Sequence, residues 1–331
     1  MNKTRQDTTT KRAKESPKDT SKGTYRVRNW ADYNESLVKR GAITLWISEA
    51  VIAGWRPVMN GPRQRGGQVQ YSDRAIECLL MVRAVFSLTY RATEGFGRSL
   101  LALLAAEVTM PDYTTLCKRS RDLAVDIPSS TQGPLHVVVD STGLKVYGEG
   151  EWKVRQHGYS KRRTWRKLHL SVDEATQAIQ AVLLTGAEVD DAEAGCQLLE
   201  DTPAPIEQVS ADGSYDKRKF YDACTKQHVA HIAIPPRRDA RIWQHANSSK
   251  PPLPRDHNLR RIRQVGRAQW KRESGYHRRS LAETAVFRFK TIFGGTLRSR
   301  SLPNQVTEAR IKCAALNRMT ALGMPEICQV A

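Results

Sequence analysis

The sequence has no run of about 18 apolar residues, so no segment of it is typical of a transmembrane helix. Its first residues lack the apolar core of a signal peptide. The six cysteines form no CxxC pair, which argues against a zinc ribbon and against a secreted disulfide scaffold. We therefore expect a cytoplasmic protein with reduced thiols and no membrane association.

Acidic residues are also scarce. The chain has 34 Asp and Glu against 53 Lys and Arg, which gives a formal net charge of +19. Hydrophobic residues make up 40% of the 331 residues, enough for a buried core in a chain whose length predicts two domains. A charge this positive indicates an anionic partner, and nucleic acid is the commonest one.

Residues 1–24 contain no Val, Leu, Ile, Phe or Trp and hold seven Lys or Arg against three acids. Such a segment buries too little apolar surface to offset the entropy of ordering it. We expect a disordered basic tail that either meets an anionic partner or merely keeps the protein soluble.

Residues 25–128 show the three- and four-residue spacing of apolar side chains that predicts helices. Near the end of this segment, Asp112 can cap a short helix with a basic exposed face. A helical bundle followed by a basic helix favours a helix-turn-helix DNA reader, although a purely structural bundle has the same pattern. The residues expected nearest the DNA are Lys118, Arg119 and Arg121.

Beyond a linker at 129–134, the chain alternates strand and helix patterns up to about residue 325, which predicts an α/β domain with a mixed sheet. Two predicted strands end in acids, Asp140 and Asp212. If these strands are parallel neighbours, the two carboxylates lie close together and favour a divalent cation between them. The alternative is that each aspartate only caps a turn.

The region 236–272 is predicted to be a basic loop inserted into this domain. Between Arg237 and Arg300 the chain has 17 Lys or Arg and four acids. Basic side chains follow phosphates and aromatic rings stack on unpaired bases, so Trp243 or Trp270 is either a stacking residue or a packing residue. The cluster expected to contact phosphate consists of Arg260, Arg261 and Arg263.

A helix predicted from Tyr276 to Phe293 carries a third acid, Glu283. Helical geometry places Tyr276, Arg279, Glu283 and Lys290 within roughly a 60° arc opposite the apolar stripe. This arc either faces a site or is a solvated surface with an Arg279–Glu283 ion pair.

The spacing Tyr276-x2-Arg279-x3-Glu283-x6-Lys290 resembles a pattern of insertion-sequence transposases of the DDE type. The stretches around Asp140 and Asp212 resemble the blocks that carry the first two acids of that group. Residues 110–116 and 321–325 also resemble its terminal blocks, and the similarity is nearest to the insertion-sequence-five family of bacterial transposases.

This resemblance implies a ribonuclease H-like catalytic core behind the helical DNA-binding domain. It implies that Asp140, Asp212 and Glu283 bind two Mg²⁺ ions, or Mn²⁺ in their place. It further implies that Tyr276, Arg279 and Lys290 bind double-stranded DNA at the element's terminal repeats. A homo-oligomer on DNA is the family expectation.

The expected function is a transposase that binds terminal inverted repeats, cleaves phosphodiester bonds and joins the ends to target DNA. Two alternatives remain open at this point. One is a ribonuclease H-like nuclease or resolvase that cuts without joining, and the other is a non-catalytic DNA-binding repressor.

Overall fold

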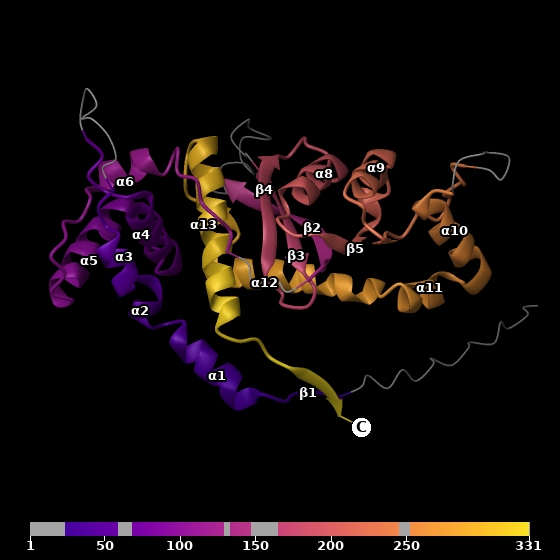
Figure 1. Cartoon of the computed structure of the whole chain (residues 1–331), viewed down its shortest axis with the longest axis horizontal. Coiled ribbons are helices and arrows are strands. Elements are labelled where there is room, and N and C mark those ends of the chain that lie inside the picture. The colour runs from indigo at the N-terminus through magenta and orange to yellow at the C-terminus, as the bar shows by residue number, and fades with distance from the viewer. Residues whose placement is uncertain (1–23, 59–67, 129–132, 147–164, 245–251, 331) are drawn as a thin grey trace, which may run out of the picture.

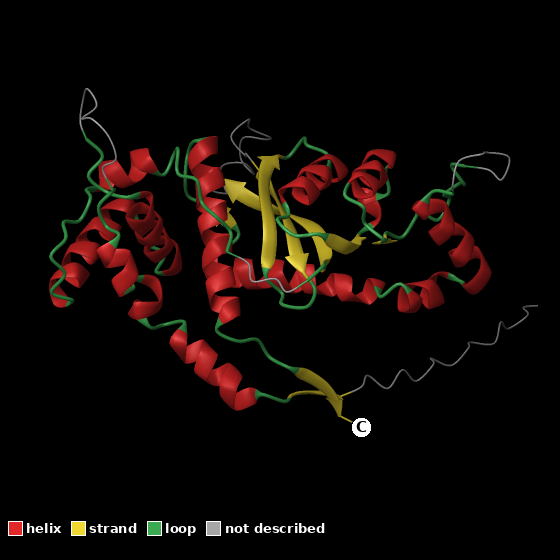
Figure 2. Cartoon of the chain, viewed as in Figure 1, coloured by secondary structure: helices red, strands yellow, loops and turns green. Residues whose placement is uncertain are grey.

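A computed structural model describes residues 24–58, 68–128, 133–146, 165–244 and 252–330 (Figures 1 and 2). The predicted tail, apart from Thr24, lies outside the described residues. Among the helices in these ranges, none combines the length and apolarity needed to span a bilayer.

A mixed sheet occupies the centre of the molecule, in the order β4-β3-β2-β5-β6, with β7 beside the far end of β2. The neighbours β2–β3 and β3–β4 are antiparallel, whereas β2–β5, β5–β6 and β2–β7 are parallel. This arrangement fits a ribonuclease H-like core. The strands are β2 (Leu135–Val146), β3 (Trp165–Asp173), β4 (Ile179–Gly186), β5 (Ile206–Ala211), β6 (His231–Ala233) and β7 (Thr296–Leu297).

The prediction that a strand ends at Asp140 is wrong, because β2 continues to Val146. The residues after Asp140 pair antiparallel with β3 as far as Lys145, and this partner holds them extended. The parallel pairing with β5, however, stops at Val139 opposite Ala211. Asp140 and Asp212 therefore follow the last paired residues of two adjacent strands, as expected.

Helices cover both faces of the sheet (Figure 1). On one face, α8 (Asp191–Asp201) and α9 (Arg218–Lys226) pack over an apolar cluster that includes Val137 and Val139 of β2. On the other face, α12 (Ser280–Phe293) and α13 (Leu302–Ala321) pack over a second cluster that includes Val138 and Leu144. Because strand side chains alternate, successive residues of β2 face different helices.

The predicted helical character of the N-terminal segment is confirmed. These helices do not form a separate core, because Trp46, Leu79 and Leu116 belong to the same hydrophobic cluster as Ile311 and Leu316 of α13. Helix α13 therefore packs against both the N-terminal helices and the sheet. The helices are α1 (Trp30–Lys39), α2 (Ile43–Trp46), α3 (Glu49–Ala53), α4 (Asp73–Val85), α5 (Tyr90–Leu103) and α6 (Tyr113–Arg119).

The prediction of a loop over 236–272 is wrong for its second half, which forms α10 (Pro254–Val265) and α11 (Arg267–Glu273). Pro254 lies in the first turn of α10, where its missing N–H is not needed. Gly266 separates the helices at a φ of +80°, a conformation that glycine adopts without strain.

A buried ion pair joins α10 to the segment between β5 and α9. The Arg255 guanidinium donates to both carboxylate oxygens of Asp216, at 2.6 and 3.2 Å, and the two side chains are 5% and 2% exposed. The neighbouring Asp256 is fully buried and accepts the backbone N–H groups of Trp243 and Gln244. Fixed charges inside the protein therefore attach this insertion to the sheet.

Sequence analysis missed two features. The long helix α13 has buried residues on all its sides, so it lacks the one-sided apolar stripe by which a helix is recognised. The strands β1 (Thr24–Val27) and β8 (Ile327–Val330) pair antiparallel, although they lie at opposite ends of the chain (Figure 1).

We predict that Asp216→Ala lowers the free energy of unfolding by about 3 kcal/mol, because the buried Arg255 loses its two-bond partner and keeps only the more distant carboxylate of Asp256, 3.8 Å away. The matched control is Glu200→Ala, which breaks the exposed ion pair with Lys226 and should cost less than about 1 kcal/mol. Urea denaturation of the full chain measures both. Equal losses for the two variants would contradict a stabilising role for the buried pair.

Candidate active site and nucleic-acid interface

Asp140 lies in the middle of β2 on the face covered by α12, the same face as Val138 and Leu144. Its side chain is 17% exposed. One of its carboxylate oxygens lies 3.9 Å from a guanidinium nitrogen of Arg279. A largely buried carboxylate on a central strand thus meets a cation.

Asp212 follows β5 directly and caps the short 3-10 helix η1 (Gly213–Tyr215). Its Oδ1 accepts the backbone N–H of Ser214 at 2.8 Å and also the Ser214 hydroxyl. The turn-capping role considered for this residue is therefore present. Both of these capping bonds use Oδ1 and leave the second carboxylate oxygen, Oδ2, out of the cap.

Glu283 lies in the first turn of α12 and is 54% exposed. It forms an ion pair with Arg279, which belongs to the preceding 3-10 helix η2 (Tyr276–Arg279). The i,i+4 pair weighed as an alternative to a site is thus observed. Since Arg279 also approaches Asp140, its guanidinium lies between two of the three predicted acids.

Asp212 and Glu283 both lie near enough to Asp140 for their charges to act on it. Burial raises the pKa of Asp140, and the negative charges of Asp212 and Glu283 raise it further, while Arg279 lowers it. Burial likewise raises the pKa of the Tyr276 phenol, to which all three carboxylates contribute. Residues from β2, the end of β5 and α12 are therefore near enough to influence one another's ionisation.

The donor chemistry suits a hard divalent cation, because carboxylate oxygens are the ligands that Mg²⁺ prefers. The arrangement does not yet form a closed set of ligands. In the described ranges, no three His, Cys, Asp or Glu side chains are placed to hold a metal ion together. Arg279 supplies the positive charge between Asp140 and Glu283 instead.

The two other residues of the predicted motif lie on either side of the acids. The Tyr276 ring packs 6.0 Å from the Trp270 ring and 5.0 Å from the Lys271 ammonium. Lys290 is exposed in the last turn of α12. Seven residues of helix separate it from Glu283, which is about 10 Å along the axis.

A polar cluster that the sequence analysis missed lies behind Asp140, on the α8 face of the sheet. The carboxylate of Asp191 accepts from the Ser141 hydroxyl at 3.2 Å and from Lys167 at 3.1 Å. His169 is fully buried beside it, and burial lowers the pKa of this histidine to about 4. The sequence signal for this cluster was Ser141, because the alternation of side chains along β2 places it on the face opposite to Asp140.

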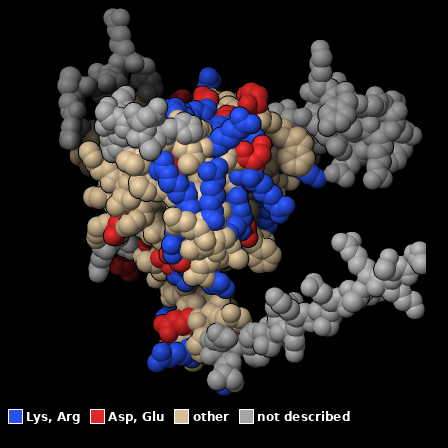
Figure 3. Space-filling view, turned by 90° about the vertical axis from the view of Figure 1, so that its right-hand side faces the viewer, with Lys and Arg blue, Asp and Glu red and all other residues tan. Residues whose placement is uncertain are grey.

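Lys and Arg side chains gather on one end of the molecule, where α10 and α11 lie (Figure 3). The three arginines predicted to contact phosphate, Arg260, Arg261 and Arg263, form different contacts within the protein. Arg261 forms a two-bond ion pair with Glu273, and Arg260 donates to the backbone carbonyl of Gln244. Arg263 is exposed, with a single long bond of 3.4 Å to a carbonyl.

Neither tryptophan of the insertion is placed as an exposed stacking residue. Trp270 is 2% exposed and donates to Asn258. The Trp243 ring lies 3.9 Å from the Arg255 guanidinium and packs edge-on against Tyr221. The packing role considered for both residues is therefore the observed one.

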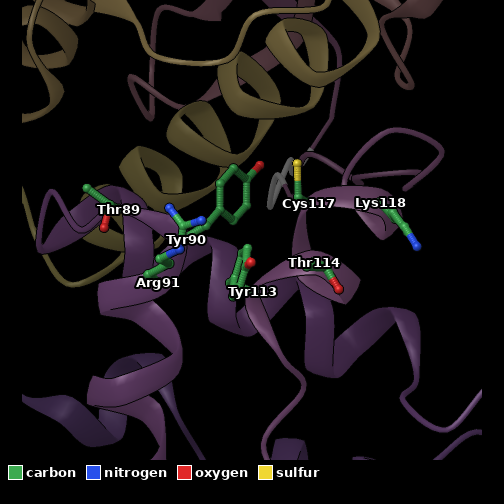
Figure 4. Close-up of a pocket in the computed structure, with 7 residues that line it drawn as sticks. All are labelled: Thr89, Tyr90, Arg91, Tyr113, Thr114, Cys117 and Lys118. Carbon is green, nitrogen blue, oxygen red and sulfur yellow. The ribbon is translucent and has the colours of Figure 1, made fainter.

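The basic helix α6 begins as predicted, because Asp112 accepts the backbone N–H of Thr115 at 2.6 Å. Lys118 and Arg121 are exposed, whereas Arg119 is held by Asp73 and by the carbonyl of Tyr71. An open pocket of about 430 Å³ lies between α6 and the start of α5 (Figure 4). It is lined by Thr89, Tyr90, Arg91, Tyr113, Thr114, Cys117 and Lys118.

Two family models of the same description match this chain. A family model described as a transposase DDE domain matches residues 131–318, and a second model of the same description matches residues 38–149. A solved structure, the piggyBac transposase synaptic complex with hairpin DNA, has a TM-score of 0.38 at 12% sequence identity. That match covers 85% of this chain and 75% of the other.

The contacts of the basic cluster predict different effects for two neighbouring arginines on duplex DNA binding. Arg263→Gln should flatten the slope of log affinity against log salt by about 0.9, the loss of one phosphate contact. Arg261→Gln should weaken binding with little change in slope, because it releases the Glu273 carboxylate towards the phosphates. Fluorescence anisotropy at several salt concentrations measures both slopes. Equal slopes for Arg263→Gln and the wild type would exclude a phosphate contact at Arg263.

Proposed function

Because the chain belongs to the DDE transposase family, we propose that it binds the terminal inverted repeats of an insertion sequence, cleaves DNA there and joins the ends to target DNA. The observation that supports the proposal is that Arg279 lies between the carboxylates of Asp140 and Glu283, while the charge of Asp212 also acts on Asp140. Membership of the insertion-sequence-five family in particular stays a prediction.

We propose that Asp140, Asp212 and Glu283 are the catalytic acids and hold two Mg²⁺ ions, for which Mn²⁺ can substitute. Two such ions stabilise the attacking and the leaving oxygen of a phosphodiester and lower the pKa of a bound water. The oxygen donors support this assignment. Glu283 is the most exposed of the described site acids and is tied only by Arg279, so it is the ligand most free to move.

Arg279 is proposed to change partners during this reaction. In the structure it neutralises Asp140 and Glu283. For the three carboxylates to share cations, the guanidinium must release Glu283, and a phosphate oxygen of the DNA is its natural new partner. Tyr276, in η2 just before α12, and Lys290, exposed in the last turn of α12, are proposed to contact the DNA end.

The DNA partner is proposed to be a duplex that contacts two separate basic surfaces. One is the end of the molecule formed by α10 and α11, which carries Arg260, Arg261 and Arg263 (Figure 3). The other is α6, the proposed second helix of a helix-turn-helix-like unit, through Lys118 and Arg121. Since two element ends must be cut and joined together, the active form is proposed to be a homo-oligomer on DNA.

The acids give the first test of this function. Replacing Asp140, Asp212 or Glu283 with Ala should abolish nicking of labelled terminal-repeat DNA in Mg²⁺ or Mn²⁺, because each change removes a carboxylate ligand. DNA binding should persist, since each change makes the surface less negative. Ca²⁺ should support binding without cleavage. The nicking assay is read beside a gel shift for each variant.

The control for these variants is Glu200→Ala, a carboxylate on α8 that pairs with Lys226 and should leave nicking unchanged. Wild-type nicking by Glu283→Ala would remove the case for three catalytic acids. Cleavage by the wild type without any joined product would identify a nuclease or resolvase, and binding without cleavage would identify a repressor.

A second test concerns DNA reading by α6. In full-length protein carrying Asp212→Ala, Lys118→Gln and Arg121→Gln should each reduce the preference for terminal-repeat over scrambled DNA. A lost base contact typically costs about 1–3 kcal/mol of discrimination. Competition gel shifts measure the preference. Arg98→Gln, an exposed arginine paired with Glu94 on α5, is the control, and an equal effect of all three would argue against reading by α6.

A further inference from the structure

The open pocket between α5 and α6 is lined by none of the proposed catalytic acids (Figure 4). Its volume of about 430 Å³ lies within the range of pockets that hold small organic ligands, and a single phosphate group would fill only a small part of it. Tyr90 and Arg91 come from the first turn of α5, and Tyr113, Cys117 and Lys118 come from α6. A ligand in this pocket would therefore contact both helices.

Two cations of the pocket are open to solvent. Arg91 and Lys118 are both exposed, and neither forms an ion pair with an acid among the residues that the structure describes. Two carboxylates at these helices have other partners, because Glu94 pairs with Arg98 and Asp112 caps α6. An anion that arrives from solvent can thus reach both cations.

Two tyrosine rings give the pocket flat walls, and both rings are only partly buried. The guanidinium of Arg91 lies 4.5 Å from the centre of the Tyr113 ring. The Tyr90 ring has the Arg83 guanidinium 4.2 Å from its centre, and its hydroxyl bonds to that of Ser120 at 3.1 Å. Because both rings are held before any ligand binds, stacking of a flat ligand on them costs little ordering entropy.

The combination of free cations with aromatic walls favours a nucleotide. Lys and Arg side chains bind phosphates, and bases stack on aromatic rings whatever their sequence. A guanidinium that lies over a ring keeps the N–H groups of its own plane for a phosphate, so Arg91 can serve both purposes. A simple anion would leave the rings unused, and an uncharged aromatic compound would leave the cations unused.

We infer that this pocket binds one unpaired nucleotide, with its base against Tyr113 and its phosphate on Arg91 and Lys118. A nucleotide displaced from bound DNA and a free nucleotide share this chemistry. Lys118 is also a proposed DNA contact of α6, which favours the DNA as the source. The inference rests on the proposed function for this source, whereas the ligand chemistry rests on the pocket.

The first experiment uses the exposed thiol of Cys117 as a reporter in the full-length protein. Its alkylation by iodoacetamide is followed by mass spectrometry beside that of Cys328, which is exposed outside this pocket. A deoxynucleoside monophosphate at ten times its dissociation constant should slow alkylation of Cys117 about tenfold and leave Cys328 unchanged. Inorganic phosphate at the same ionic strength should slow neither.

Variants identify the contacts, each compared with its own rate without nucleotide. Tyr113→Leu and Arg91→Gln should each remove the protection of Cys117. Lys226→Gln, which removes an exposed cation of α9, should keep it. If Tyr113→Leu folds poorly, Arg91→Gln decides alone. Equal protection by inorganic phosphate, or no protection by the nucleotide, would overturn the inference.

The second experiment identifies the source of the nucleotide. Full-length protein carrying Asp212→Ala is bound to terminal-repeat duplexes that contain one extra unpaired nucleotide, moved stepwise along the repeat. One position should bind more tightly than the fully paired duplex, because the cost of unpairing is already met. Adding Tyr113→Leu should weaken binding at that position about tenfold, through the loss of one stacked base. Protection of Cys117 without any such position would assign the pocket to a free nucleotide and overturn the DNA source.

These outcomes are separable from those that test the proposed function. Cleavage and joining of DNA by a protein whose Cys117 is not protected by nucleotide would refute the pocket and leave the function intact. Protection of Cys117 in a protein that neither prefers nor cuts terminal repeats would support the pocket and refute the function.

Discussion

The parallel pairing of β2 with β5 is the constraint on which the candidate site depends. The parallel ladder stops at Val139 opposite Ala211, so Asp140 and Asp212 each follow its last residue pair and lie next to each other on adjacent strands. Two carboxylates so placed need a nearby positive charge. In the structure Arg279 provides it, and the same arginine tethers Glu283 on α12. The arrangement of the site thus follows from one strand register and one guanidinium.

The alternation of side chains along β2 divides its polar residues into two groups with different surroundings. Asp140 faces α12, whereas Ser141 faces α8 and the Asp191–Lys167 pair. Ser141, Asp191 and Lys167 are linked by hydrogen bonds and connect β2 to the start of α8. The charged residues of the insertion also form two groups, one in buried ion pairs and one exposed on the surface. Arg255 is bound internally to Asp216, so not all of the 53 Lys and Arg side chains are available to an anionic partner.

Local patterns in the sequence predicted those parts of the structure that local physics determines. Asp112 and the apolar spacing after it predicted α6, and the period of two predicted the β3–β4 hairpin. The strand was expected to end at Asp140 because Ser-Thr-Gly is typical of a turn, and only pairing with β3 holds it extended. Arg255 and Asp216 are 39 residues apart, so nothing local predicts their contact. The helix α13 was missed because it is buried on all sides.

That helix has a mechanical consequence. Because α13 packs against α4 on one side and the sheet on the other, the N-terminal helices and the acids share a continuous close-packed wall. Such a wall transmits displacement instead of absorbing it, unlike a flexible linker. If α6 binds one stretch of DNA, the rigid packing then fixes the distance along the DNA between that stretch and the bond that is cut.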